Sequence, residues 1–210
     1  MLKDKRVSPL AAIWKAGQFG NTSNGAAVTF TTRLPEALVQ VQSWPSTEGE
    51  VRKAVDGVTK AKRGKGIGSK AAQDGERFAV YQTAGASIMP TGPGRWLIEG
   101  HGSDLEGQLR AAIPAELGAV TGLSHSRVVV VVEGPKAEWL LATGIGLDFD
   151  RRAFAVGTTR QGHHHEIGLT IVRTDDAAFE LYAFTSYARG LWHWLHTTAQ
   201  EVGYEVKAAS

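Results

Sequence analysis

The sequence of 210 residues contains no cysteine. This absence excludes a disulfide framework, a cysteine nucleophile, a zinc finger and an iron–sulfur cluster, because each of them needs cysteine sulfur. It also fits a reducing compartment. Long hydrophobic runs are lacking too, since even the valine run at residues 128–132 has the length of a strand rather than the roughly 18 residues of a membrane span. The apolar run at residues 10–14 is too short for a signal-peptide core. We therefore expect a cytoplasmic protein with no membrane partner.

The chain has little excess charge of either sign, with a formal net charge of +2. Its basic residues are nevertheless partly concentrated in a glycine-rich stretch, at Lys60, Lys62, Arg63, Lys65 and Lys70. No aromatic residues interleave with them, which does not favour a nucleic-acid partner. The stretch also lacks the glycine spacing of a Walker or dinucleotide-binding loop. It is interpreted either as a solvated loop or as a contact with an acidic partner surface.

Hydrophobic spacing predicts an α+β fold of two packed mixed lobes with antiparallel sheets. Alternation or a continuous apolar run predicts strands at residues 28–33, 38–44, 78–81, 95–99, 126–133, 154–160, 167–173 and 179–184. Three- and four-residue spacing predicts helices at residues 46–58 and 186–202. Further helices are predicted at residues 104–110 and from Pro135, which suits the first turn of a helix. A turn is expected over residues 87–93, which include Pro90 and Gly92.

The predicted elements divide the chain into three parts. Residues 1–27 are expected to be irregular, residues 28–120 to form the first lobe and residues 121–210 the second, with the lobes packed as one body. In each lobe a similar strand precedes a helix: residues 95–99 precede the helix from Asp104, and residues 179–184 precede the helix from Ser186. This similarity suggests an internal duplication.

Histidines are the most conspicuous candidates for chemistry. If residues 163–165 lie on a strand, His163 and His165 face the same side, and His193 with His196 lie three residues apart on the last helix. Such pairs could begin a zinc or copper site. The alternative is a solvated hairpin tip and a polar helix surface, and this alternative is preferred. Trp192 lies off the apolar stripe of the last helix, so it is either a core residue or a partner contact.

No catalytic or cofactor-binding residue is expected. Ser124, His125 and Ser126 lie near one another, but neither serine has the G-x-S-x-G surroundings of a hydrolase nucleophile.

Several segments resemble a known family. They are residues 93–98 (PGRWLI), 123–127 (LSHSR), 133–141 (EGPKAEWLL), 178–188 (AFELYAFTSYA) and 191–195 (LWHWL). Together they resemble the gamma subunit of heterotetrameric sarcosine oxidase and, more distantly, the folate-binding fold of the glycine-cleavage T-protein. The resemblance covers residues 90–205 well and the first 90 residues thinly.

The resemblance implies a non-catalytic structural subunit with alpha, beta and delta partners. The implied complex oxidises sarcosine to glycine with hydrogen peroxide and, with tetrahydrofolate, gives 5,10-methylenetetrahydrofolate. It also implies that FAD, FMN, NAD, zinc and tetrahydrofolate belong to the other subunits, and that this chain holds no cofactor. The alternative is a stand-alone folate-binding protein or aminomethyltransferase of the T-protein type.

One departure from the T-protein pattern bears on that alternative. Ile167 and Gly168 stand where T-proteins typically place the paired aspartates of the folate site. An apolar pair cannot hydrogen-bond a pterin or stabilise a cationic intermediate. The adjacent Glu166 does not replace them, because neighbouring residues on a strand point to opposite faces. Independent folate binding is therefore not expected.

Overall fold

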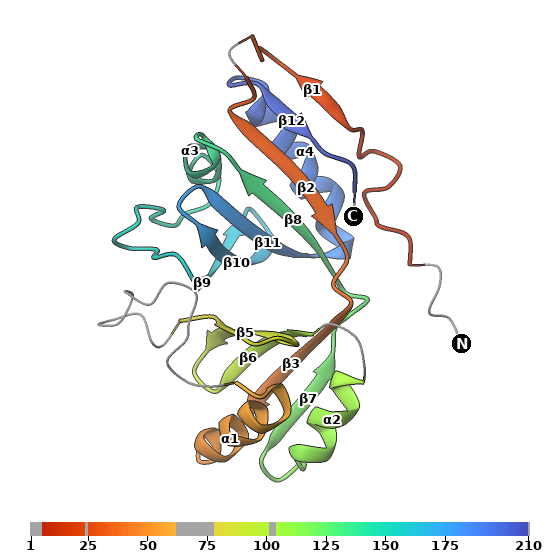
Figure 1. The fold of residues 1–210 in the computed structure, drawn as a ribbon, viewed down its shortest axis with the longest axis vertical. Coiled ribbons are helices and arrows are strands. Elements are labelled where there is room, and N and C mark those ends of the chain that lie inside the picture. The colour runs from red at the N-terminus through yellow and green to blue at the C-terminus, as the bar shows by residue number, and fades with distance from the viewer. Residues whose placement is uncertain (1–5, 24, 62–77, 101–103, 210) are drawn as a thin grey trace. The chain divides into compact units, whose positions relative to one another are not determined.

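The computed structural model describes residues 6–23, 25–61, 78–100 and 104–209. By its internal contacts the chain divides into two compact units. The first unit comprises residues 1–34, 125–154 and 161–210, and the second comprises residues 35–124 and 155–160. Each is a mixed α/β unit with a mainly antiparallel sheet (Figure 1), as the sequence predicts. None of the described helices is both long enough and apolar enough to cross a membrane.

The first unit contains a seven-stranded sheet in the order β1-β12-β2-β8-β11-β10-β9. β12 and β2 run parallel, whereas β2, β8, β11 and β10 are successively antiparallel. Its strands are β1 (Gly17–Phe19), β2 (Val28–Arg33), β8 (Arg127–Glu133), β9 (Thr158–His164), β10 (Ile167–Asp175), β11 (Ala178–Phe184) and β12 (Tyr204–Val206). Its helices are α3 (Ala137–Ala142), the 3-10 turn η1 (Thr185–Tyr187) and α4 (Ala188–Ala199).

Both longer helices of the first unit cover one face of its sheet. Val128, Val130 and Val132 of β8 share a core cluster with Leu140 of α3 and Leu191 of α4. Alternate residues of a strand point to the same face, so α3 and α4 pack on the same side. Complete burial of each such side chain stabilises the fold by about 1.5–3 kcal/mol. The central valine strand is therefore the base on which this unit is built.

The segment before β2 is largely irregular over residues 6–23, as expected, but it contributes to the core. Leu10 and Trp14 belong to the core cluster of the first unit. The Trp14 ring lies 4.3 Å from the Trp192 ring of α4, centroid to centroid. Its indole Nε1–H donates to the Lys207 carbonyl at 2.9 Å. The short strand β1 then pairs with β12, so this segment closes the sheet and covers α4.

The second unit contains a five-stranded sheet in the order β4-β5-β6-β3-β7, with every pairing antiparallel. Its elements are β3 (Ala37–Ser43), α1 (Glu48–Thr59), β4 (Tyr81–Gln82), β5 (Ala86–Gly92), β6 (Arg95–Gly100), α2 (Leu105–Ala112) and β7 (Gly118–Gly122). Val39 and Ile98 of the sheet share a core cluster with Val51 of α1 and Leu109 of α2. Both helices therefore cover the same face of this sheet (Figure 1).

The predicted turn over residues 87–93 is wrong, because most of these residues form β5. The hairpin to β6 turns later, at Gly94, whose φ of 60° and whose approach to Ser43 both favour glycine. Pro90 is tolerated in β5 because the pairing of β5 with β4 ends at Ile88, so no ladder hydrogen bond to β4 needs its missing N–H. The pairing of β5 with β6 also shifts register between Pro90 and Gly92.

The unit boundaries differ from the predicted lobes of residues 28–120 and 121–210. Residues 28–34 belong to the first unit because β2 pairs with β8, about 100 residues later in the chain. Residues 155–160 belong to the second unit, where Val80 donates to the Gly157 carbonyl at 2.8 Å. That the lobes pack as one body stays a prediction.

Candidate functional site

The three consecutive histidines lie where β9 turns into β10. His163 is exposed on β9, whereas His165 occupies the turn with a positive φ of 47°. His164 points back to the helix layer: its ring stacks on Trp194 of α4, with centroids 4.1 Å apart and planes at 13°. Its Nδ1 lies 3.0 Å from the Gly144 carbonyl. His163 and His165 therefore do not form the same-strand pair that a metal site would need.

The two histidines of α4 form a loose pair. The rings of His193 and His196 are 5.5 Å apart, centroid to centroid. Burial lowers the pKa of His196, and the charge of His193 lowers it further. No group of three or more potential metal ligands occurs in the described ranges 6–23, 25–61, 78–100 and 104–209. The four predicted candidate histidines thus are not brought to a common point.

The predicted partner contacts have different outcomes. Lys60 ends α1 in a left-handed conformation and is exposed. Lys62, Arg63, Lys65 and Lys70 lie outside the described residues. Trp192 does not fit the predicted contact, because only 5% of its surface is exposed. It packs between Trp14 and Phe30, so the core alternative describes its position.

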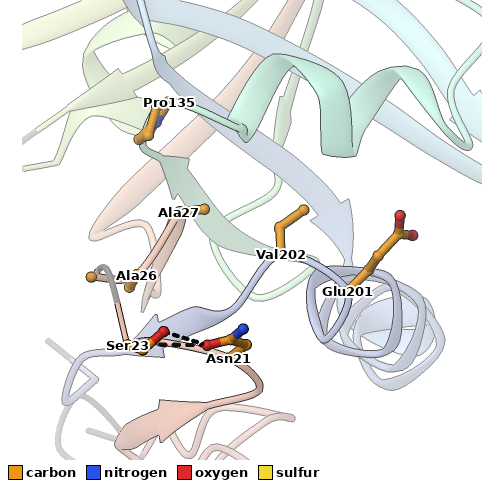
Figure 2. A pocket seen from close by; sticks show the side chains of 8 residues that line it. Asn21, Ser23, Ala26, Ala27, Pro135, Glu201 and Val202 are labelled. Carbon is orange, nitrogen blue, oxygen red and sulfur yellow. Dashed lines mark hydrogen bonds between the residues drawn. The ribbon is translucent and has the colours of Figure 1, made fainter.

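A pocket of about 320 Å³ lies in the first unit, beside the C-terminal end of α4 (Figure 2). Its lining residues are Asn21, Ser23, Gly25, Ala26, Ala27, Pro135, Glu201 and Val202. The Asn21 side-chain oxygen accepts the Ser23 hydroxyl at 2.8 Å, so it already has a partner. Glu201 is the one titratable lining residue. A lone carboxylate without a base or a nucleophile beside it does not make a catalytic site.

A smaller pocket of about 140 Å³ lies in the second unit. It is lined by Glu48, Arg52, Phe78, Pro90, Gly92, Pro93 and Trp96. Glu48 and Arg52 are one turn apart on α1, and the guanidinium of Arg52 lies 5.4 Å from the Tyr81 ring centroid. The volume suits one side chain rather than a cofactor, since ligand pockets are usually about 300–1,000 Å³.

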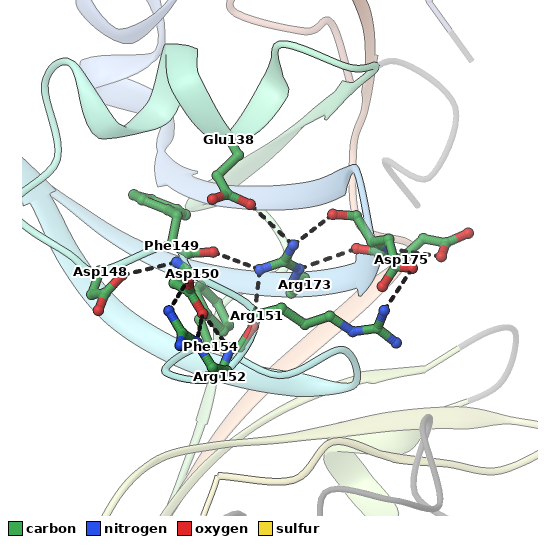
Figure 3. A network of polar contacts seen from close by, with 10 residues as sticks. Glu138, Asp148, Phe149, Asp150, Arg151, Arg152, Phe154, Arg173 and Asp175 are labelled. Atoms are coloured by element: carbon green, nitrogen blue, oxygen red, sulfur yellow. Dashed lines mark hydrogen bonds and ion pairs between the residues drawn. The ribbon is translucent and has the colours of Figure 1, made fainter.

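A polar network centred on Arg173 of β10 is structural (Figure 3). Only 2% of this residue is exposed. Its guanidinium donates to the carbonyls of Phe149, Phe154 and Asp176, and pairs with Glu138 of α3 at 3.2 Å. These contacts join α3, the loop before β9 and the β10–β11 turn. Because the buried donors already have acceptors, the group fixes the loop and is not free to bind a ligand.

The comparisons with known proteins agree with one another. No protein-family model matches the chain. The curated sarcosine oxidase subunit gamma of Corynebacterium sp. (strain P-1) is 29% identical over 122 residues, which is 58% of this chain and 60% of that protein. The subunit gamma of Arthrobacter sp. is 30% identical over 112 residues, or 53% of this chain and 55% of that protein.

The chain resembles sarcosine oxidase gamma subunits. The resemblance predicted from its sequence segments is thereby confirmed, although the matched region spans less than two thirds of either relative's length. The fold agrees over a longer stretch. A chain of the heterotetrameric sarcosine oxidase from Corynebacterium sp. U-96 in complex with pyrrole 2-carboxylate has a TM-score of 0.73 and 22% identity. That match covers 94% of this chain and 96% of the other.

The predicted T-protein-like fold is also confirmed. The glycine cleavage system aminomethyltransferase T from Bartonella henselae has a TM-score of 0.60 and 14% identity, covering 96% of this chain and 59% of that protein. Ile167, which stands at a predicted T-protein carboxylate position, is buried in the core of the first unit, and Gly168 beside it is exposed. Neither residue offers a charge or a hydrogen-bonding side chain.

Three side chains that the sequence patterns did not single out lie at one end of the larger sheet. They are Arg127 of β8, Phe184 of β11 and Tyr187 of η1. The Arg127 guanidinium lies 3.3 Å from the Phe184 ring centroid. Their common location depends on the pairing of β8 with β11, which local sequence does not reveal. One feature of the sequence indicates an exposed Phe184: it is the last residue of an alternating strand and lies on the face opposite to the core.

Proposed function

We propose that this chain is the gamma subunit of a heterotetrameric sarcosine oxidase and acts as its structural, partner-binding component. The observation that carries the proposal is the fold match to a chain of that enzyme over nearly the whole length of both chains. The sequence match to two proteins named subunit gamma supports the same assignment. Similarity of fold alone is compatible with any protein that has the T-protein-like fold. The sequence match is more specific and favours the gamma subunit.

The proposal assigns the oxidative chemistry to other chains. Sarcosine would be oxidised to glycine with release of hydrogen peroxide in the cytoplasm, and the methyl carbon would pass to tetrahydrofolate in the larger subunits. FAD, FMN, NAD and zinc would likewise be bound by the alpha, beta and delta partners. The described residues support this division of labour, because the two pockets above hold no nucleophile–base pair and Arg173 is occupied by its own chain.

Co-purification tests the assignment. The chain, carrying an affinity tag at its natural locus in the source organism, is recovered and its companions are identified by mass spectrometry. We expect three further chains in equal amounts, flavin absorbance, and peroxide production from sarcosine. A homogeneous preparation of this chain alone, from cells that oxidise sarcosine, would overturn the proposal.

The second candidate, a stand-alone folate-binding protein or aminomethyltransferase, is favoured by the fold match to aminomethyltransferase T. The apolar Ile167 and the exposed Gly168 argue against it. Titration of the purified chain with 5-formyltetrahydrofolate, followed by calorimetry, separates the two candidates. The structural assignment predicts no heat of binding at micromolar concentrations, whereas saturable micromolar binding would favour the second candidate.

A further inference from the structure

Strand register places an arginine and an aromatic ring side by side at the end of the larger sheet. Arg127 of β8 and Phe184 of β11 are direct partners across the antiparallel pair. Both belong to the alternate set of positions that faces away from the core cluster, since Val128 and Ala183 beside them face into it. Directly opposed residues on one face lie close enough to interact. The 3.3 Å separation between the guanidinium carbon and the ring centroid follows from this register.

Arg127 differs from the other arginine on this face of the sheet in having no carboxylate partner. Arg33 of β2 pairs with Glu180 at 3.1 Å. The guanidinium of Arg127 contacts the Ser126 hydroxyl at 3.0 Å and the Ser126 carbonyl at 3.4 Å. Among the described residues of the first unit, no carboxylate lies within ion-pair distance of it. Partial burial lowers the pKa of Arg127 to about 10. A half-buried cation without a counter-ion is stabilised when another molecule supplies a carboxylate to pair with it.

Two exposed aromatic side chains accompany this arginine. Phe184 is 42% exposed and Tyr187 is 44% exposed, and they are two of the four large hydrophobic residues that are exposed in the described part of the chain. The Tyr187 hydroxyl has no hydrogen-bond partner among those residues. Arginine and tyrosine are enriched among the residues that dominate protein–protein binding energies, and aromatic residues are enriched at interfaces.

We propose that Arg127, Phe184 and Tyr187 form a docking surface, here called the Arg127 surface, for a carboxylate-bearing segment of another subunit. The proposal rests on the assignment as a gamma subunit and adds to it the place and the chemistry of a partner contact. An aspartate or glutamate of the partner pairs with the Arg127 guanidinium, whose other face packs on the Phe184 ring. The Tyr187 hydroxyl donates to the same carboxylate or to a neighbouring carbonyl.

The single charge of the Arg127 surface favours a protein partner over nucleic acid. Binding of a nucleic-acid backbone rests on several lysines or arginines that neutralise successive phosphates. Here one guanidinium lies against an exposed phenylalanine, and an exposed tyrosine follows three residues later in the chain; arginine and aromatic residues are typical of the centre of a protein interface. Once the aromatic rings are covered, the ion pair is shielded from water and contributes more than an exposed pair does.

Co-expression with the partner subunits tests the surface. The tagged chain is prepared as wild type, Arg127→Gln, Arg127→Lys and Tyr187→Phe, and the partner chains retained after a salt wash are quantified. Arg110→Gln is the matched control, because Arg110 is an exposed arginine of the second unit that already pairs with Glu106. We expect Arg127→Gln to retain partner chains at least about tenfold less than wild type. Arg127→Lys should lie between the two, Tyr187→Phe should show a smaller loss, and Arg110→Gln should match wild type.

A photo-crosslinking residue at position 187 gives a second readout that does not depend on a destabilising variant. We expect its crosslink in a partner peptide that carries an aspartate or glutamate. Full retention of partners by Arg127→Gln would overturn the Arg127 surface, as would a crosslink to nucleic acid or to a second copy of this chain. These outcomes leave the proposed function intact, whereas failure of the wild-type chain to retain any partner would contradict the proposed function itself. Thermal unfolding of each variant shows whether a loss of partner chains is due to misfolding. If it is, the crosslink from position 187 tests the Arg127 surface instead.

Discussion

The two units share one order of helices and strands, but they differ in the strand that completes each sheet. In the second unit the chain order β3-α1-β4-β5-β6-α2-β7 gives the sheet order β4-β5-β6-β3-β7. In the first unit the order β8-α3-β9-β10-β11-α4-β12 repeats it, and β9-β10-β11-β8 correspond to β4-β5-β6-β3. The last strand is the difference: β7 pairs directly with β3, whereas β2 takes that place beside β8 and β12 lies on its outer side.

This difference shows how the second unit comes to be inserted within the first. The strand that completes the larger sheet precedes the second unit in the chain, so its pairing with β8 must close a loop of about 100 residues. It also enlarges the core, because Phe30 of β2 contacts Trp192 of α4 and Tyr204 of β12. The smaller unit has a core cluster of its own and needs no such strand.

Replacing Phe30 is expected to produce the largest effect. Phe30 is completely buried in the core of the first unit, so Phe30→Ala should lower the free energy of unfolding by about 3–5 kcal/mol. Val120→Ala, which alters the corresponding strand of the second unit, should cost less, about 2 kcal/mol. Urea denaturation measures both changes. Hydrogen exchange should show the loss of protection at β8 in the first variant and at β3 in the second. Equal losses in both sheets would contradict two separate cores.

Replacing Arg173 should be the next most severe change, and it too should affect only the first unit. Arg173→Ala leaves three carbonyl groups without their donor, which should cost about 3 kcal/mol. Nearby exposed Arg151 pairs with Asp176 at 3.0 Å and serves as the control, since Arg151→Ala should cost less than 1 kcal/mol. Thermal or urea unfolding compares them. Similar costs for the two variants would show that the buried network does not fix the loop.

A smaller effect is expected on the exposed face of α2. Glu106 pairs with Arg110 one turn later at 2.8 Å, and both side chains are well exposed. Glu106→Gln should lower stability by about 0.3–0.5 kcal/mol, and the loss should vanish in 1 M salt. Gln108→Ala, on the same helix but outside this pair, should show no such salt dependence. A salt-independent loss would mean that Glu106 acts through packing instead.

The corresponding helix α4 carries the pair His193 and His196 instead, and its contribution should be the smallest and depend on pH. The pKa of His196 is lowered from 6.5, so below about that pH the unfolded chain binds more protons than the folded chain. Stability is therefore lost as the pH falls through the pKa of the folded state. Urea unfolding near pH 7.5 and near pH 5.5 should show a smaller difference for His196→Gln than for wild type. If the stability difference between the two pH values were the same in His196→Gln as in wild type, the lowered pKa of His196 would be contradicted.

The elements that were predicted well are those with strong local patterns. The alternation of β2, the valines of β8 and the spacing of α4 are all visible in a few consecutive residues. The helix that the sequence predicts at residues 104–110 is α2 (Leu105–Ala112), and the structure shows that the Asp104 side chain accepts the Gly107 N–H at 3.0 Å. The sequence does not predict β1, β7 and β12, because strands of three to five residues carry little pattern.

The candidate site was less predictable than the fold. Trp192 lies off the apolar stripe that local spacing defines, and it is buried because Trp14, more than 170 residues away, covers it. The metal hypothesis requires residues 163–165 to lie on one strand, but β9 ends at His164 and His165 lies in the turn with a positive φ. Arg127 and Phe184 became neighbours only through the register of two strands.

The sequence by itself determined the class of the elements, the absence of thiol chemistry and the family resemblance, because each of these depends on residue types and short spacings. Only the tertiary structure decided which strand closes the larger sheet, which tryptophan is covered and which arginine has no carboxylate beside it. The physical reason is that these properties depend on pairings between residues distant in the chain. Such pairings are selected by the burial and register of the whole sheet rather than by any local propensity.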